Sequence, residues 1–561
     1  MIRIIFAVEL ETMKTLMLML ALAGSPRAGD DFLPSVLFLT GALGAEELDV
    51  TELERWAGLA ARPLDINSAP RSRLLSSGLF SAWQVASIID TRTRTGDILS
   101  ATELSLIDGF DRETAAALSH FVTFRTRDAP GSRKRDRLSG EMMLRGAVRS
   151  ASAGLRVPWG VKAELDIGDR AGIYWGTRTS YSEPSATPGT AHLELTPSRV
   201  PARLVLGDFS ARFGQGLALW SGFSMSGFSS VQAFRRNGSG LGASTSFTRT
   251  LHGAAADADI GPWVISAAYS YPSTCIANAT RHSRNASLGM TAVADLRSGS
   301  SAVSADWRAG MRSVSFFGEA ALSKSASRPV PAALAGAIVV PRYGHRFSAL
   351  LRWYPADYQA PYCGSAHAFS KVRDEAGAAV GMQIPGLSTT FDWAVHPSDG
   401  GQQQKLVAQC SHTFAAGDFT AVPSVRAAIR HKSASTRTDI RGDLSLSYGR
   451  MNISARANVL WCKDFAWLWN AGPAWKGEVL QAQARFTLFK VDEWDDRIWC
   501  YDPDVPGTFS IPAYYGRGYA ISALAGWKGM LYVRLSVVEY PWTVPEKQGS
   551  AECKLQCRIR F

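Results

Sequence analysis

The chain has 561 residues, a net charge of +11 and a hydrophobic fraction of 46%. No apolar run approaches the roughly 18 to 20 residues of a membrane-spanning helix, which excludes a helical membrane protein. The mean hydropathy of -0.04 does not exclude a membrane β-barrel, because the apolar residues of a barrel alternate with polar ones. The positive charge suits a barrel lumen lined with arginine, or contact with lipid headgroups, lipopolysaccharide or nucleic acid.

The longest apolar run, residues 16–23, indicates a secretory signal peptide. It follows Lys14 and leads into a stretch of small residues that ends at Ala28. A short apolar run with a basic residue before it and small residues after it is typical of a cleaved signal. We therefore expect residues 1–28 to be a signal peptide, with Met13 as an alternative start.

The next two segments are expected to be helical. Residues 29–62 form an N-terminal segment with a short amphipathic helix over 50–59. Residues 63–124 have helical spacing, few aromatic residues and tight turns at Gly78 and Gly109, which predicts four short helices in two pairs. The residues expected to cap these helices are Asn67 or Ser68, Ser81, Ser100 and Asp111.

Residues 125–137 are expected to be a basic linker, because they contain a Pro-Gly-Ser turn and a cluster of four basic residues at 133–137, without apolar periodicity. From residue 138 to residue 561 the pattern changes to alternation with a period of two, which is a strand period. At about 20 to 25 residues per strand and connection, this stretch predicts about 16 to 22 strands.

The last strand shows the alternation most clearly. Leu555, Cys557, Ile559 and Phe561 fall on one face, and Lys554, Gln556, Arg558 and Arg560 fall on the other. A strand with one apolar and one charged face that ends on an aromatic residue is typical of an outer-membrane barrel. We therefore expect Leu555, Ile559 and Phe561 to face lipid and to form the signal that the barrel-assembly machinery reads.

Upstream stretches repeat the pattern, for example 303–308, 452–461, 481–488 and 531–537. Alternation alone also fits a soluble sandwich, but Trp and Tyr concentrate at expected strand ends, as in the aromatic girdles of membrane barrels. The predicted fold is therefore mainly β: a large antiparallel transmembrane β-barrel over 138–561, preceded by a small all-α helix-hairpin-helix domain over 63–124.

Four motifs suggest a family for the helical segment. They are Leu64-Asp65-Ile66-Asn67-Ser68-Ala69, Leu74-Leu75-x-x-Gly78-Leu79, Ile88-Ile89-Asp90-Thr91-Arg92 and Glu103-Leu104-x-x-Ile107-Asp108-Gly109-Phe110. This segment resembles the tandem helix-hairpin-helix domain of competence DNA-receptor proteins. With the segments 206–209 and 213–220, the whole chain resembles a family of Bacteroidota outer-membrane proteins that place this module before a barrel.

The resemblance implies a phosphate-binding site, because in DNA-binding members the backbone N–H groups of each Gly-hydrophobic-Gly turn contact a phosphate. The candidate residues here are Gly78, Leu79, Phe80, Ser81, Gly109, Phe110, Asp111, Arg92 and Arg94. The second glycine of each turn is missing, since Phe80 and Asp111 replace it. Phe80 would add bulk and Asp111 a negative charge, while Ser81 and Asp111 can cap the N–H groups that a phosphate would need.

Three functions remain open. The helical module is expected to serve as a docking or plug module in an envelope complex, with a periplasmic protein as its partner. The alternatives are DNA binding or uptake, with DNA as the partner, and a passive diffusion channel. No motif of a common enzyme class is present, and we expect no catalysis, cofactor or metal. The expected location is the outer membrane and its lipid, with the N-terminal domain in the periplasm.

Overall fold

The computed structural model describes residues 32–126 and 138–561, apart from positions 43, 49, 62, 70, 152–153, 169, 180–188, 198–199, 201, 223–226, 248–250, 284, 312, 325–327, 343, 434 and 544–546. The expected signal peptide and most of the expected linker lie outside the described residues.

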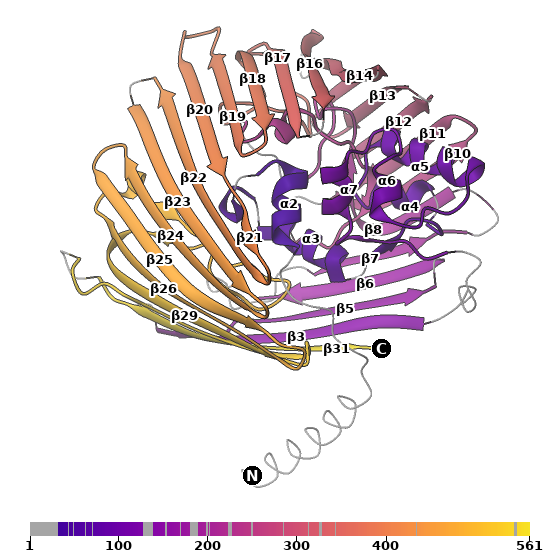
Figure 1. Cartoon of the computed structure of the whole chain (residues 1–561). Helices are drawn as coiled ribbons and strands as arrows, with labels where there is room; N and C mark the ends of the chain where they lie inside the picture. Colours follow the sequence, from indigo (N-terminus) through magenta and orange to yellow (C-terminus); the bar gives the residue numbers. More distant parts are fainter. Residues whose placement is uncertain are drawn as a thin grey trace.

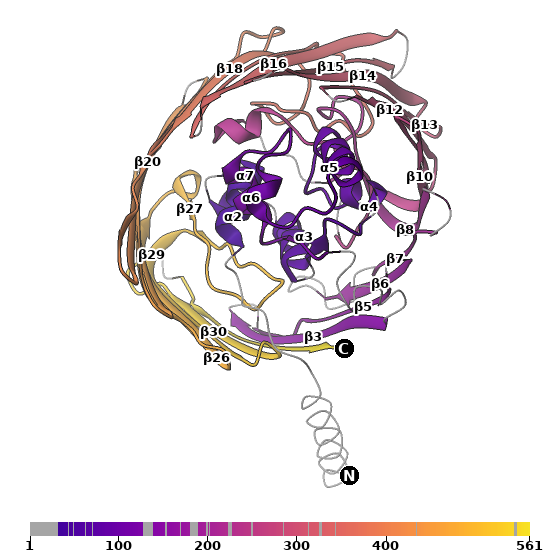
Figure 2. The same cartoon turned by 45° about the vertical axis from the view of Figure 1, so that its right-hand side comes forward.

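The strands form a closed antiparallel barrel around a set of helices (Figures 1 and 2). The ring closes where β3 pairs with β31, in a register that places Glu141 opposite Arg560. The barrel strands are β3 (Leu138–Ala151), β5 (Trp159–Ile167), β6 (Ala171–Arg178), β7 (Thr190–Leu195), β8 (Ala202–Arg212), β10 (Leu251–Ile260), β11 (Trp263–Ser270), β12 (Thr274–His282), β13 (Ala286–Asp295), β14 (Ser300–Met311), β15 (Val314–Lys324), β16 (Val330–Arg342), β17 (His345–Tyr354), β18 (Glu375–Ile384), β19 (Leu387–Val395), β20 (Gln402–Ser411), β22 (Phe419–Lys432), β23 (Ser435–Tyr448), β24 (Met451–Trp461), β25 (Phe465–Lys476), β26 (Leu480–Val491), β29 (Gly516–Trp527), β30 (Leu531–Glu539) and β31 (Ser550–Arg560).

The fold class is confirmed, and the barrel is larger than the expected 16 to 22 strands. The described residues contain 24 barrel strands. The sequence estimate was low because it allowed too many residues for each connection. At the end of the barrel where β3 begins and β31 ends, the turns between strands are only two to six residues long.

The two faces of the wall follow the predicted alternation. On β31, Leu555 is 50% exposed and Phe561, just after the strand, is 64% exposed on the outer surface, whereas Gln556 is fully buried inside. On β24, Ile453 and Trp461 are exposed outside while Arg456 is buried inside. The apolar face is therefore the outer face of the barrel, and the polar face lines the lumen.

The connections at the two ends of the barrel differ in length. All long connections lie at the end opposite to residues 138 and 561, and the longest are residues 213–250, 355–374 and 492–515. The first and third of these loops carry the short strands β9 (Gly240–Ala243), β27 (Ile498–Trp499) and β28 (Ala513–Tyr514), and the 3₁₀ turns η2 (Val231–Phe234) and η3 (Trp494–Asp496), whereas β4 (Gly154–Arg156) lies between β3 and β5. The strand β21 (Phe414–Ala416) extends the hairpin of β20 and β22.

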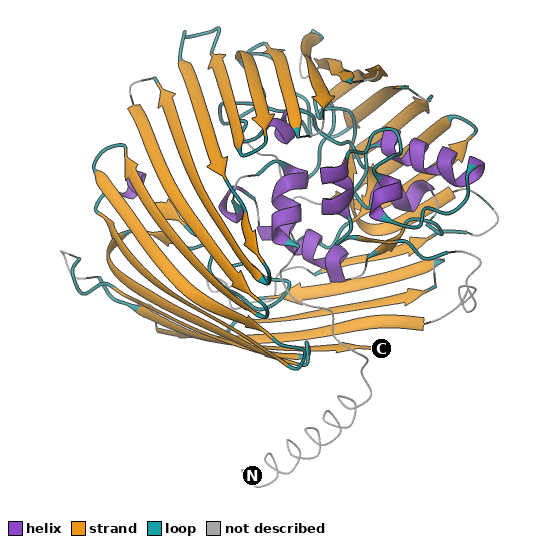
Figure 3. Ribbon diagram, in the orientation of Figure 1, coloured by secondary structure: helices purple, strands orange, loops and turns teal. Residues whose placement is uncertain are grey.

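Residues 32–126, called here the helical region, lie inside the ring of strands (Figure 3). The region contains α2 (Leu33–Thr40), η1 (Ala45–Glu47), α3 (Val50–Ala61), β1 (Leu64–Asp65), α4 (Arg71–Ser76), α5 (Ala82–Arg94), α6 (Ala101–Leu104), α7 (Arg112–Leu118) and β2 (Val122–Thr123). No described helix is long and apolar enough to cross a membrane.

One hydrophobic core joins the two expected N-terminal segments. Phe121 packs edge-to-face on Phe32 and Trp56, at ring centroid distances of 6.2 and 5.0 Å. The core also includes Val264 from the barrel wall and Phe509 from a long loop. The two expected segments, 29–62 and 63–124, therefore share one core, and residues of the barrel complete it.

Three of the four predicted caps are present, at Ser81, Ser100 and Asp111. The hydroxyl of Ser81 accepts from the backbone N–H of Gln84, whose side chain accepts from the Ser81 N–H, so a full capping box opens α5. The side chain of Asp111 accepts from the Thr114 N–H at the start of α7. Asn67, expected as a cap, instead lies buried and bonds the backbone at Ile98 and Arg125.

Candidate functional site

The interface between the helical region and the barrel wall is rich in ion pairs. Carboxylates of the helical region face basic residues on the inward faces of strands that lie all round the barrel. The pairs are Glu46 with Arg441 and Arg456, Glu47 with Arg426, Glu52 with Arg212, Glu54 with Lys162 and Arg178, and Asp111 with Arg346. Because these pairs are mostly buried, each would leave an uncompensated charge in the lumen if the helical region moved away.

Glu46, in η1, bonds Arg441 and lies 3.3 Å from Arg456. Its burial alone would raise the pKa of the carboxyl, but the guanidinium groups of Arg441 and Arg456 outweigh burial and lower the pKa to about 2. Glu46 is therefore ionised in the docked arrangement at any physiological pH. Its charged partners come from the barrel wall and not from the helical region.

Glu52, in α3, links the helical region to β8. Its carboxylate accepts from Arg55 at 2.6 Å within the same helix, and from Arg212 of the wall at 3.3 Å. Burial would raise the pKa of Glu52, but Arg55 and Arg212 together lower it to about 2. Two residues further along α3, Glu54 lies 3.3 Å from Lys162 and 3.8 Å from Arg178.

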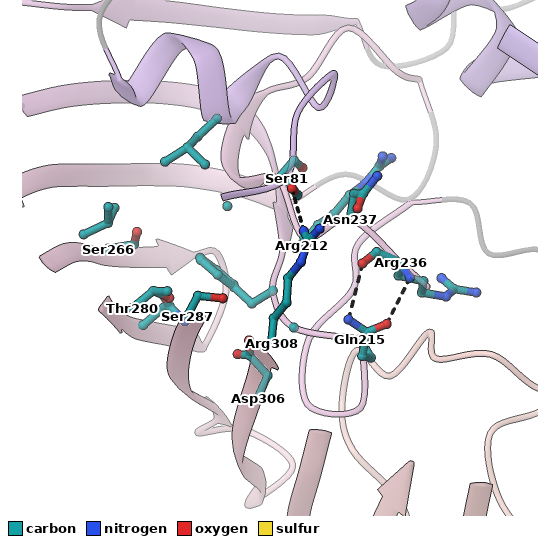
Figure 4. Close-up of a pocket in the computed structure, with 18 of the residues that line it drawn as sticks. Ser81, Arg212, Gln215, Arg236, Asn237, Ser266, Thr280, Ser287, Asp306 and Arg308 are labelled. Carbon is teal, nitrogen blue, oxygen red and sulfur yellow. Dashed lines mark hydrogen bonds between the residues drawn. The ribbon is translucent and has the colours of Figure 1, made fainter. Parts of the chain in front are cut away.

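The first candidate turn, residues 78–81, faces the wall. The Ser81 hydroxyl accepts from the Arg308 guanidinium at 2.8 Å, as Figure 4 shows. Gly78 has a positive φ of 70°, and Arg55 lies against it. Phe80 was expected to add bulk at a phosphate-facing surface; it is instead fully buried and packs edge-to-face on Phe110. Its apolar ring completes the core, and Leu79 is buried there as well.

The second candidate turn, residues 109–111, also faces the wall. Gly109 has a φ of 94°, and the Phe110 ring points into the core. Asp111 pairs with Arg346 at the start of β17, where it was expected to repel a phosphate. Each candidate turn therefore presents a side-chain oxygen, of Ser81 or Asp111, to an arginine of the barrel.

The two candidate arginines of α5 make contacts within the helical region. The Arg92 guanidinium donates to the Ala69 carbonyl at 2.8 Å. Arg94 pairs with Asp90 at 3.0 Å on an exposed face of the helix. The structure thus brings Ser81 and Asp111 to the wall, while Arg92 and Arg94 each bond a group of the helical region.

The resemblance also rested on the segments 206–209 and 213–220. In the structure, residues 206–209 lie in β8, and residues 213–220 begin a long loop that lies inside the lumen. Gly207, with a φ of 102°, has no room for a side chain, because a Cβ would lie 2.2 Å from the Ala191 carbonyl oxygen. Beyond the end of β8, the chain turns inward. There the Glu319 carboxylate of β15 accepts the backbone N–H groups of Gln215 and Leu217 at 2.6 and 3.1 Å.

Two further loops are bonded into the same lumen. The Tyr358 hydroxyl donates to the Leu217 carbonyl at 2.9 Å and joins loop 355–374 to the segment above. Loop 492–515 is held by the last strands, where Lys554 pairs with Asp504 at 2.8 Å and the Gln556 amide donates to the Pro506 carbonyl at 2.8 Å. Tyr514 is buried in this loop, away from the interfacial girdle expected of Trp and Tyr residues.

Sequence reasoning identified Ser81 and Asp111 but missed their partners. Arg308, Arg346, Arg441 and Glu319 all lie on polar faces of alternating strands, so the sequence could show that they point inward. It could not show what they meet, because each partner lies more than 100 residues away along the chain.

The described residues contain no group of three or more His, Cys, Asp or Glu side chains that could hold a metal ion. The seven cysteines are present as free thiols. The polar contacts described above are ion pairs and hydrogen bonds of amide, hydroxyl and carboxylate groups.

No protein-family model and no curated protein matches the chain. Among solved structures, the chain is similar to the outer membrane protein OpdK from Pseudomonas aeruginosa, with 7% identity, 76% of this chain and 99% of that chain covered, and a TM-score of 0.29. It is similar to the P pilus usher (PapC) translocation pore, with 9% identity, 75% and 99% covered, and a TM-score of 0.37. It is also similar to an E. coli P pilus tip assembly intermediate, PapC-PapD-PapK-PapG, with 11% identity, 76% and 62% covered, and a TM-score of 0.46. These identities and TM-scores assign no family and no function to the chain.

Proposed function

We propose that this protein is an outer-membrane channel closed by its own N-terminal helical region, which acts as a plug. The observation that carries the proposal is the set of ion pairs between the plug carboxylates, at positions 46, 47, 52, 54 and 111, and the basic residues of the lumen. These pairs join two folded parts of the chain by charge, so protonation or replacement of the carboxylates would weaken the interface, as a gate requires.

The shape of the barrel supports an outer-membrane location and a periplasmic origin for the plug. Outer-membrane barrels carry short turns on the periplasmic side and long loops outside. Here the turns of two to six residues lie at the end with residues 138 and 561, and the long loops lie at the other end. The helical region therefore joins the barrel at the end that we assign to the periplasm.

The resemblance of residues 63–124 to tandem helix-hairpin-helix domains remains part of the proposal. We infer that the module has been adapted to dock on the barrel, because Ser81 and Asp111 of its two turns bond Arg308 and Arg346. DNA handling would require the helical region to leave the wall first. DNA binding by the full chain only after undocking would support that alternative.

A periplasmic partner fits the exposed side of the module. Leu106 is 82% exposed and Leu99 is 55% exposed, close together in sequence around α6. Large apolar side chains on a surface can mark a binding site for another protein. We propose that such a partner moves the plug.

The test is conductance of the purified full chain in a planar lipid bilayer. The variant Glu46→Gln/Glu52→Gln/Glu54→Gln removes three plug charges, and Glu478→Gln, at an exposed pair with Arg450, is the matched control. We expect wild type and control to be mostly closed and the triple variant to open often. A steady, identical conductance in all three would instead indicate a passive diffusion channel, and silence in all three would argue against a channel.

A further inference from the structure

A cavity of about 520 Å³ lies between the second turn of the helical region and the barrel wall. Three arginines line it, and each comes from a different element: Arg235 from loop 213–239, Arg308 from β14 and Arg346 from β17. Residues 109–111 line the opposite side. Cavities of this volume commonly hold small-molecule ligands.

The cavity is lined by more arginines than carboxylates. The carboxylates that line it are Asp108 and Asp111, and Asp111 already pairs with Arg346. The Nε atom of Arg235 is buried and has no hydrogen-bond partner among the described residues. Burial lowers the pKa of Arg235 to about 10, and the neighbouring Arg346 adds to the effect while Asp111 opposes it. A guanidinium in this position would be stabilised by an anion.

A second, smaller cavity of about 80 Å³ adjoins the first and is drawn in Figure 4. Arg235, Asn237 and Arg308 line both cavities. The Oδ1 atom of Asn237 is buried there without a hydrogen-bond partner. The polar surface around Arg235 thus continues on both sides of the loop and offers more than one group to a ligand.

We propose that the larger cavity binds a small phosphate-bearing anion, inorganic phosphate or a phosphomonoester, held by Arg235 with Arg308 and Arg346 beside it. The flat guanidinium group has donors spaced to bind two phosphate oxygens at once. The anion would contact the loop, the wall and the docked helical region together. It would therefore bind the docked form best and stabilise it. The site depends on the docked arrangement and not on conduction.

The test is isothermal titration calorimetry of the full chain in detergent, with inorganic phosphate, glycerol 3-phosphate and sulfate as the ligands. Arg235→Gln removes the guanidinium donors, and Arg235→Lys keeps the positive charge but loses the paired N–H groups. The matched control is Arg450→Gln, which removes an exposed arginine at a short turn. Heat-modifiable gel migration reports whether each variant folds. We expect saturable binding of at least one phosphate compound by wild type and Arg450→Gln, weakened about ten- to hundredfold in Arg235→Gln and less in Arg235→Lys.

If inorganic phosphate binds more tightly, the ligand is free phosphate; if glycerol 3-phosphate binds more tightly, the ligand is a phosphomonoester. Equal affinity in folded wild type and both Arg235 variants would overturn the site, and so would the absence of saturable binding by folded wild type. Sulfate binding as tight as phosphate would overturn the assignment to phosphate. Because none of these measurements uses conductance, their failure would leave the plug proposal standing.

Discussion

Asp111 shows how one residue serves the helix and the docking interface together. Its carboxylate caps α7 by accepting from the Thr114 N–H and also pairs with Arg346 of the wall. Asparagine caps a helix about as well as aspartate does but carries no charge. The two contributions of Asp111 can therefore be separated by a single substitution.

We predict that Asp111→Asn weakens docking by about 1 to 3 kcal/mol while α7 stays folded. Arg346→Gln should weaken it by a similar amount, and the double variant should cost less than the sum, because both changes remove the same pair. Protease cleavage of the helical region in intact barrels would measure the docked fraction. Asp90→Asn, at the exposed pair with Arg94, should change nothing; additive effects of the two docking variants would refute a direct pair.

The last strand, β31, combines two functions on its two faces. Its outward residues, such as Leu555, are apolar, and its inward residues Lys554 and Gln556 hold loop 492–515. Its pairing with β3 closes the ring. The strand therefore contributes to the outer surface, the lumen and closure at once.

We predict that Ile559→Asp lowers the amount of assembled barrel strongly, because a charge on the lipid face is costly in a membrane barrel. Ile559→Val keeps the face apolar and is the matched control. Heat-modifiable migration of outer-membrane fractions measures the yield. Normal assembly of Ile559→Asp would show that this position does not face lipid in the membrane.

The inward loop at residues 213–239 depends on Glu319, which accepts three backbone N–H groups from Gln215, Leu217 and Ala218. We predict that Glu319→Gln loosens the loop, at a cost of about 1 to 3 kcal/mol, because an amide cannot accept from all three donors as a carboxylate does. Hydrogen exchange at residues 215–218 should rise while the wall strands stay protected. Unchanged exchange at these N–H groups would contradict this account.

At the scale of the whole molecule, the barrel wall and the helical region carry opposite charges at the ion pairs that join them. The lumen presents arginine and lysine, and the helical region presents Glu46, Glu47, Glu52, Glu54 and Asp111. The positive net charge of the chain is thus partly a lumen charge. Attraction between these opposite charges holds the helical region in place and makes docking sensitive to pH.

We predict that acidification releases the plug. Glu46 has a pKa of about 2 when docked, against an ordinary value of 4.5. Since the docked pKa is the lower one, its stabilisation of roughly 3 kcal/mol is complete above pH 4.5 and is lost as the pH falls toward 2. Bilayer conductance should rise within this window. Glu46→Gln should show a smaller rise, and an equal rise in both proteins would exclude Glu46 as a cause.

We also predict that a disulfide can lock the plug. A Cβ at position 78 would lie 3.7 Å from the Ser239 Cβ, which matches disulfide geometry. In the double variant Gly78→Cys/Ser239→Cys, oxidation should therefore suppress the acid-induced opening, and reduction of the disulfide should restore it. Gly78→Cys alone is the control. Opening of the oxidised double variant, once its cross-link is verified by mass spectrometry, would show that ions pass without plug movement.

The sequence by itself determined the local structure. Alternation along strands such as β24 and β31 predicted which side chains face out, because a strand presents alternate residues to opposite faces. Ser81 and Asp111 predicted their helix starts, because a cap acts within three residues. Fold class and helix positions followed from these short-range patterns.

Only the tertiary structure decided what each inward charge meets. Glu46 and Arg441 are 395 positions apart, and nothing local couples them. The same holds for Phe80, which looked like an obstacle in a turn and is a core residue. The number of strands was likewise underestimated, because it depends on the lengths of the turns, and the alternation along the strands does not give those lengths. Closing the ring around the helical region creates the docking interface, and so its pairs depend on the geometry of the whole barrel.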